Sequence, residues 1–187
     1  MRKDGGGLIF LMMSYSDAQK LQLPFLSDLF SQVSNQYPVL KALVPNDIPY
    51  DTKSSFSLYI NHRKTFTGIT DNDRSLTMKK FAELVTRIKD KQTKVAVQEF
   101  GNEFRSPGHV PICIASEHLL NKRKGHTELV ISLLEMAGLT LVGSGCEIMG
   151  EHGKALPKEE ARKYAEKNNL VFLEGNDIIK AWKQWSK

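Results

Sequence analysis

The sequence has 187 residues, of which 41% are hydrophobic and 25% charged. This balance is typical of a globular domain and excludes a disordered or fibrous chain. The 26 basic and 21 acidic residues give a net charge of +5, and both signs are mixed along the chain. A nucleic-acid binder usually gathers its basic residues on one face, so we expect no nucleic-acid partner. A chain of this length buries about 70% of its unfolded surface, which predicts a single domain over residues 1–187.

The two cysteines, Cys113 and Cys146, form no CxxC pair, so the sequence predicts neither a disulfide framework nor a thiolate zinc site. This cysteine usage fits the reducing cytoplasm. The apolar run at residues 8–13 is too short for the core of a signal peptide, and no run approaches the roughly 20 residues of a membrane-spanning helix. We therefore expect a cytoplasmic protein with no membrane partner.

The first third of the chain mixes strand and helix patterns. The apolar run 8–13 predicts a buried strand, and Ser16 with Asp17 predicts a brief helix that Pro24 ends. Residues 28–43 are helical in part. Beyond a loop marked by Asn46, Asp47 and Pro49, apolar residues alternate with polar ones from residue 56 to 61. This period of two predicts a half-buried strand.

A helical period follows, with Thr70 as the expected cap and apolar residues at 78, 81, 85 and 88. Strands are predicted at 95–97 and 112–114, on either side of a loop at 101–108. A helix over 127–137 should end at Gly138, and strands are expected at 139–142 and 146–149. A helix with Pro157 in its first turn and a last helix at 176–185 complete the chain. These elements predict an α+β fold in which a mixed β-sheet is flanked by helices.

A basic segment lies where a loop is expected to become a helix: Arg123, Lys124, Gly125, His126 and Thr127. A helix start presents unpaired backbone N–H groups, arginine donates two parallel hydrogen bonds, and glycine allows close approach, so the segment predicts a phosphate pocket. His126 is a candidate metal ligand or proton-transfer group. A capped helix beside a solvated basic loop is the alternative interpretation.

Two further segments are candidates for catalysis. Pro107 and Gly108 favour a tight loop that presents Arg105 and His109 in a defined direction. Glu147 lies in a strand-like apolar run, where an inward carboxylate would need a partner or an altered pKa, and strand alternation could equally turn it to solvent. The lone histidines His62 and His118 are expected at the surface. No GxGxxG or GxxxxGK[ST] motif is present, which excludes the dinucleotide and P-loop classes.

The chain resembles the 3,4-dihydroxy-2-butanone 4-phosphate synthase family of riboflavin biosynthesis, in its stand-alone archaeal-like form. The resemblance covers nearly the whole chain and rests on several segments in the same order: MRKDGGGLI, SSFSLYINHRKTFTGITDNDR, EFRSPGHV, KGHTE, CEIMGEHG and NNLVFLEGNDII. It implies a lyase that converts D-ribulose 5-phosphate to L-3,4-dihydroxy-2-butanone 4-phosphate and formate. It also implies Mg²⁺ or Mn²⁺ as the cofactor that stabilises an enediolate, and a homodimer with active sites at the subunit interface.

The resemblance assigns a role to each motif. His109 and Glu147 correspond to the catalytic histidine and glutamate of the family, and Glu147 also contacts the substrate. The segment 123–127 would hold the substrate, chiefly its phosphate, and His126 would bind the metal. Thr67, in the FTGI segment, would lie near the substrate.

The sequence departs from the family at two places. Many members carry Cys where this chain has Phe10. Members also have a strand and an acidic loop, with metal-binding glutamates, before the segment that here starts at Met1, so we expect the domain to lack them. Mg²⁺ prefers carboxylate and water oxygens, and one histidine is a poor site for it. Two functions therefore stay open: the synthase, and a catalytically silent relative that binds a sugar phosphate.

Overall fold

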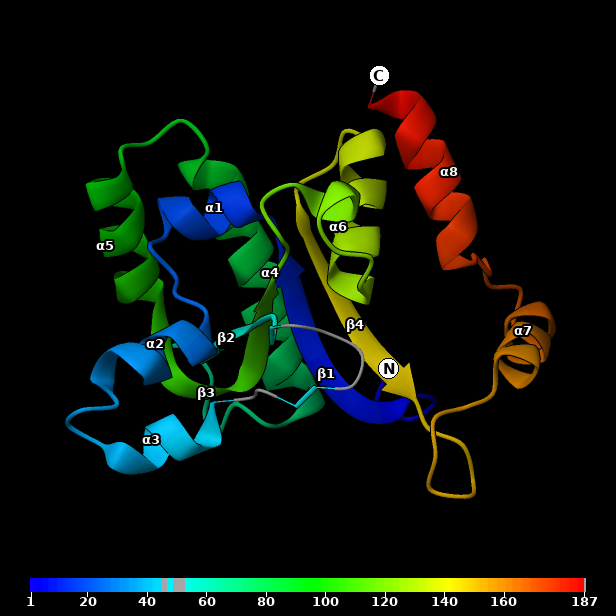
Figure 1. The fold of residues 1–187 in the computed structure, drawn as a ribbon, viewed down its shortest axis with the longest axis horizontal. Helices are drawn as coiled ribbons and strands as arrows, with labels where there is room; N and C mark the ends of the chain where they lie inside the picture. The colour runs from blue at the N-terminus through cyan, green and yellow to red at the C-terminus, as the bar shows by residue number, and fades with distance from the viewer. Residues whose placement is uncertain (45–46, 49–52, 187) are drawn as a thin grey trace.

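The computed structural model describes residues 1–44, 47–48 and 53–186, so the predicted loop residues Asn46 and Pro49 lie outside the described residues (Figure 1). The elements in chain order are β1 (Gly6–Met13), α1 (Tyr15–Lys20), α2 (Leu26–Val33), α3 (Pro38–Leu43), β2 (Phe56–His62), α4 (Asp71–Ile88), α5 (Thr93–Glu103), β3 (Phe104–Ile114), the 3₁₀ turn η1 (Leu119–Asn121), α6 (His126–Met136), β4 (Val142–Ile148), α7 (Lys158–Lys167) and α8 (Gly175–Trp185). Among these helices, none combines the length and apolar character that a membrane crossing requires.

Within the described residues, the strands form one four-stranded sheet in the order β2-β3-β1-β4. β1 is parallel to β3, with Leu11 opposite Ile112, whereas β4 runs antiparallel to β1 and β2 runs antiparallel to β3. Parallel and antiparallel pairs in one sheet, covered by helices, confirm the predicted α+β fold with a mixed sheet.

Strand β1 is an inner strand of the sheet, and helices cover its apolar residues on both faces. Leu11 and Met13 pack into the core that α4 and α5 complete, while Met12 faces Ile131 of α6. Figure 1 shows α4 behind the sheet and α6 in front of it, with α8 beside α6. A continuous apolar run is what a strand buried on both faces requires.

Two local signals are confirmed at helix ends. Thr70 caps α4, because its hydroxyl accepts a hydrogen bond from the Asp73 N–H at 3.2 Å. Gly138 follows the last turn of α6 with φ +65°, the left-handed conformation that a helix stop requires. The helix expected from Ser16 starts at Tyr15 instead, since Ser14 is its cap and accepts from the Asp17 N–H.

The strand predicted at 95–97 is wrong, because these residues belong to α5. Ala96 is buried, and Phe100, one turn later, stacks on Phe104 with ring centroids 5.3 Å apart. The apolar face of the segment therefore has a helical period. The loop predicted at 101–108 is likewise wrong, since α5 ends at Glu103 and β3 starts at once.

The two strands predicted at 139–142 and 146–149 are one strand, β4, over Val142–Ile148. Glycine lowers strand propensity, so the two glycines within β4 made one strand resemble two. A Cβ on Gly143 would lie 2.6 Å from Cγ1 of Val130 on α6. This glycine lets the helix approach the sheet closely.

Two polar residues of β2 that its alternating pattern places toward solvent are buried instead. Ser57 and Asn61 are buried, and so is His62, which was expected at the surface. Burial lowers the pKa of His62 below its ordinary value, with weaker contributions from the charged residues around it. On the side that the alternating pattern assigns to solvent, only Tyr59 is exposed, so the pattern does not separate an inner from an outer side.

Candidate functional site

The start of α6 is fixed by a buried carboxylate. Glu128 is fully buried, and its Oε2 accepts a hydrogen bond from Nη1 of Arg123 at 2.5 Å. Its Oε1 accepts from both the N–H (2.8 Å) and the hydroxyl (3.0 Å) of Ser116. Because Ser116 follows β3, this carboxylate ties the end of β3, the connecting loop and the first turn of α6 together, and it holds the Arg123 guanidinium in a defined position.

The predicted phosphate segment is only partly convergent. Gly125 caps α6, and a Cβ there would lie 2.1 Å from Nη1 of Arg123, so glycine is needed for the arginine to fold over the helix start. Thr127 is buried, whereas Lys124 and His126 are exposed. The structure therefore brings Arg123 to the backbone of Gly125 and leaves the other two charged or titratable side chains at the surface.

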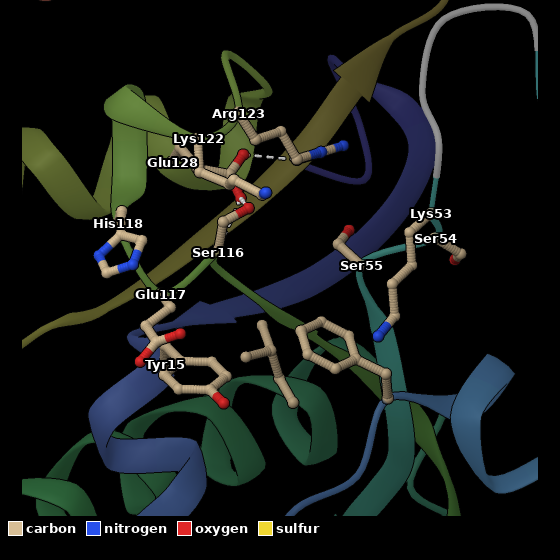
Figure 2. Close-up of a pocket in the computed structure, with 12 residues that line it drawn as sticks. Tyr15, Lys53, Ser54, Ser55, Ser116, Glu117, His118, Lys122, Arg123 and Glu128 are labelled. Atoms are coloured by element: carbon tan, nitrogen blue, oxygen red, sulfur yellow. Dashed lines mark hydrogen bonds and ion pairs between the residues drawn. The ribbon is translucent and has the colours of Figure 1, made fainter.

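A cavity of about 350 Å³ opens beside Arg123. Figure 2 shows Arg123, Glu128 and Ser116 on one side of it and Lys53 with Ser55 across from them. The other lining residues are Tyr15, Phe25, Ser54, Ile114, Glu117, His118 and Lys122. Sequence reasoning assigned a role only to Arg123 among these residues, although Ser54, Ser55 and Glu128 lie in segments that carry the family resemblance. The cavity as such was missed, because its lining comes from segments far apart in the chain.

His109 lies on β3 and contacts Asn61 of β2. The Asn61 Oδ1 accepts a hydrogen bond from the His109 N–H at 2.9 Å, and the Asn61 Nδ2 lies 3.1 Å from Nδ1 of the imidazole. Asn61 is buried and His109 is exposed. The imidazole is thus held from the protein side and open to solvent on the other. Sequence reasoning missed Asn61, which it counted among the polar residues of an alternating strand.

Glu147 lies near the end of β4 with an exposed side chain, so the solvent-facing alternative for this residue is closer to what the structure shows. Its carboxylate is nevertheless held, since Oε2 accepts a hydrogen bond from the Leu8 N–H of β1 at 2.9 Å. A Cβ on Gly7 would lie 2.7 Å from the same oxygen. The glycine run before β1 therefore makes room for this carboxylate.

The strand order relates these groups to one another. β1 lies between β3, which carries His109, and β4, which carries Glu147, so the two side chains come from strands that are not neighbours in the sheet. Burial raises the pKa of the Cys113 thiol on β3 to about 11, and the charges of Arg123, Glu147 and Glu128 also act on it.

Thr67 lies in an exposed loop before α4. The carboxylate of Asp73 accepts from the Gly68 N–H at 2.8 Å and lies 3.4 Å from the Thr67 hydroxyl. Arg105 donates to the carbonyl oxygens of Thr65 at 3.1 Å and Phe66 at 3.3 Å. Since Gly68 packs directly on Asn61, this loop adjoins the Asn61–His109 pair.

The described residues do not form a complete metal site. Among them, no three His, Cys, Asp or Glu side chains gather closely enough to hold a metal ion. His126 would supply a single nitrogen ligand, which does not fit the oxygen-rich shell that Mg²⁺ prefers.

A mixed sheet between helices carries a guanidinium at a helix start, and an imidazole and a carboxylate on the strands either side of β1. The comparisons with known proteins specify the family. The chain matches the family model of 3,4-dihydroxy-2-butanone 4-phosphate synthase over residues 1–181. It belongs to this family, whose members are lyases.

Two archaeal proteins of that name are similar to the chain. The protein from Methanothermobacter thermautotrophicus is 46% identical, over 99% of this chain and 78% of the relative. The protein from Archaeoglobus fulgidus is 44% identical, over 99% of this chain and 77% of the relative. At this identity and coverage, the relatives support the same family membership.

Solved structures support the fold. A crystal structure of 3,4-dihydroxy-2-butanone 4-phosphate synthase in complex with two magnesium ions superimposes with a TM-score of 0.68, at 22% identity, over 98% of this chain and 77% of that one. The synthase of Candida albicans also gives 0.68 at 22% identity, over 96% of this chain and 74% of that one. The sheet and its helices are thus the fold of these enzymes.

Proposed function

We propose that the chain converts D-ribulose 5-phosphate to L-3,4-dihydroxy-2-butanone 4-phosphate and formate, a step of riboflavin biosynthesis. The observation that carries the proposal is the arrangement around β1: Arg123 at the start of α6, with His109 and Glu147 on the flanking strands. The family membership supports this arrangement as a catalytic one. The comparisons do not favour the alternative of a catalytically silent relative.

Phosphate recognition is the role of the α6 start. The first N–H groups of a helix are unpaired and its dipole favours an anion, so an arginine fixed there adds a charge-assisted donor. The Glu128 carboxylate fixes Arg123 before substrate arrives, which lowers the entropy lost on binding. The contributions of Lys124, His126 and Thr127 stay predictions, as does that of Thr67.

Proton transfer is the role of His109 and Glu147. The reaction begins by removing a proton next to a carbonyl, which needs a base near the carbon and a donor near the oxygen. The imidazole of His109 on β3 and the carboxylate of Glu147 on β4 are the two groups that we assign to these roles. Both side chains are exposed and held by a hydrogen bond at one end, by Asn61 and by the Leu8 N–H.

Three further properties stay predictions from the family resemblance. A requirement for Mg²⁺ or Mn²⁺ is expected, with His126 as the predicted ligand, and the described residues include no group of three candidate ligands. A homodimer with active sites at the subunit interface is expected, as is a cytoplasmic location. Dialysis against EDTA followed by addition of each cation tests the first, and sedimentation velocity tests the second.

Formate release from D-ribulose 5-phosphate in the presence of Mg²⁺ tests the function. We expect formate from the wild type, no formate from His126→Ala, and an increased KM for Arg123→Ala, since the guanidinium binds the phosphate. Lys163→Ala, an exposed lysine on α7, is the matched control and should keep wild-type kinetics. Binding of the substrate without formate would support the silent relative instead.

A further inference from the structure

The contact between Asn61 and His109 determines how both side chains are oriented. Asn61 is 3% exposed and lies beneath the imidazole. It makes two contacts with the same residue, one through each end of its amide: Oδ1 with the His109 N–H and Nδ2 with the imidazole Nδ1. Such a two-point contact fixes the orientation of both side chains.

The backbone contact determines which end of the amide is the oxygen. A backbone N–H can only donate, so its partner at 2.9 Å must be the amide oxygen of Asn61. The NH₂ group then faces the imidazole Nδ1 at 3.1 Å and can only donate. Nδ1 must therefore be the acceptor, without a proton, and the neutral ring carries its proton on Nε2.

Two glycines let the surrounding backbone pack closely around this contact. A Cβ on Gly68 would lie 2.1 Å from the Asn61 Nδ2, so only glycine leaves room for the amide beside the loop before α4. A Cβ on Gly108 would lie 2.0 Å from the carbonyl carbon of Ile60, which brings β3 close enough for the His109 N–H to reach Asn61. Both glycines are places where no side chain fits.

We propose that Asn61 is a positioning residue that holds His109 as the neutral Nε2–H tautomer. This inference rests on the proposed function for the role of His109. A histidine in this form offers a hydrogen-bond donor at Nε2, which stabilises the oxygen of a substrate carbonyl as negative charge develops on it. It has no acceptor available for the carbon-bound proton, so that proton goes to a carboxylate, for which Glu147 is the candidate.

The tautomer is measured without substrate. Long-range ¹H–¹⁵N correlation NMR of the full chain labelled with ¹⁵N-histidine distinguishes Nδ1–H from Nε2–H, and His109→Gln identifies the signals of His109. We expect Nε2–H in the wild type. In Asn61→Asp, which keeps the size of the side chain, the carboxylate accepts a proton from Nδ1, so the tautomer should change to Nδ1–H. A wild-type ring protonated on Nδ1, or no change in Asn61→Asp, would overturn the proposal.

The catalytic consequence is measured as formate release. Asn61→Asp, which loses the donor at Nε2 of His109, should reduce kcat about 100-fold with little change in KM. General acid–base groups contribute roughly 10²–10⁴-fold to the rate. Asn176→Asp, an exposed asparagine on α8, introduces the same charge and should keep wild-type kinetics and the Nε2–H signal. A variant with the changed tautomer and wild-type kcat would refute the donor role. If the wild type releases no formate, the proposed function fails, while the NMR result still decides the tautomer.

Discussion

Replacing Glu128 with alanine tests whether the buried carboxylate organises the site. The substitution removes the acceptor for three hydrogen bonds, from the Arg123 guanidinium and from the N–H and hydroxyl of Ser116. Breaking a buried charged pair by removing one partner costs about 3–5 kcal/mol. The Arg123 side chain is 23% exposed, so water screens part of its charge and the lower value, about 3 kcal/mol, applies. For a domain of this size, that corresponds to a Tm lower by about 6–12 °C.

Differential scanning calorimetry of the wild type and Glu128→Ala measures the shift. Glu160→Ala, an exposed glutamate on α7, is the control and should change stability by less than about 0.5 kcal/mol. The Tm of Glu128→Gln should lie between those of the wild type and Glu128→Ala, because an amide oxygen can still accept from Ser116 but carries no charge. A Tm for Glu128→Ala within about 2 °C of the wild type would refute the reasoning.

Two further predictions concern packing and pH. Gly143→Ala places a methyl group 2.6 Å from Val130 and should lower the free energy of unfolding, measured in urea, by about 1–3 kcal/mol. Gly101→Ala on α5 meets no atom within 4 Å and should raise the free energy of unfolding by about 0.5–1 kcal/mol. Equal effects of the two substitutions would contradict the packing argument. Burial raises the pKa of Cys113 from 9.0 to about 11, so the unfolded thiol ionises first and stability is lost as pH rises from 9 to 11, by up to about 3 kcal/mol. Cys113→Ala should lose less stability over this range, and a slope identical to the wild type would contradict the burial of the thiol.

Local signals predicted the parts of the fold that neighbouring residues decide. The hydroxyl of Thr70 satisfies an N–H three residues away, and Gly138 adopts a conformation that other residues avoid. The apolar run of β1 needs no partner to be recognised as buried. Each of these features depends on residues that are close together in the sequence.

The parts that sequence reasoning missed depend on segments far apart in the chain. Val95 and Val97 suggest a strand, but Ala96 and Phe100 meet a core built by α4 and β3, and this packing overrides β propensity. In the site, the basic cluster indicated Arg123, while Ser116 and Asn61 became visible only through their contacts with Glu128 and His109. For Asn61, the one available signal was a polar residue within a segment that carries the family resemblance.

The position of β1 in the sheet has a consequence for synthesis on the ribosome. Both of its neighbours, β3 and β4, come from much later in the chain, with Met13 opposite Ile114 and Val142. About a hundred residues must follow before the first partner strand exists, which takes roughly 5–20 s at ordinary elongation rates. During that time, Leu8–Met13 is an unpaired apolar strand of the kind that associates with other chains. Nascent chains of this protein should therefore depend on chaperones that bind short apolar segments until β3 has emerged.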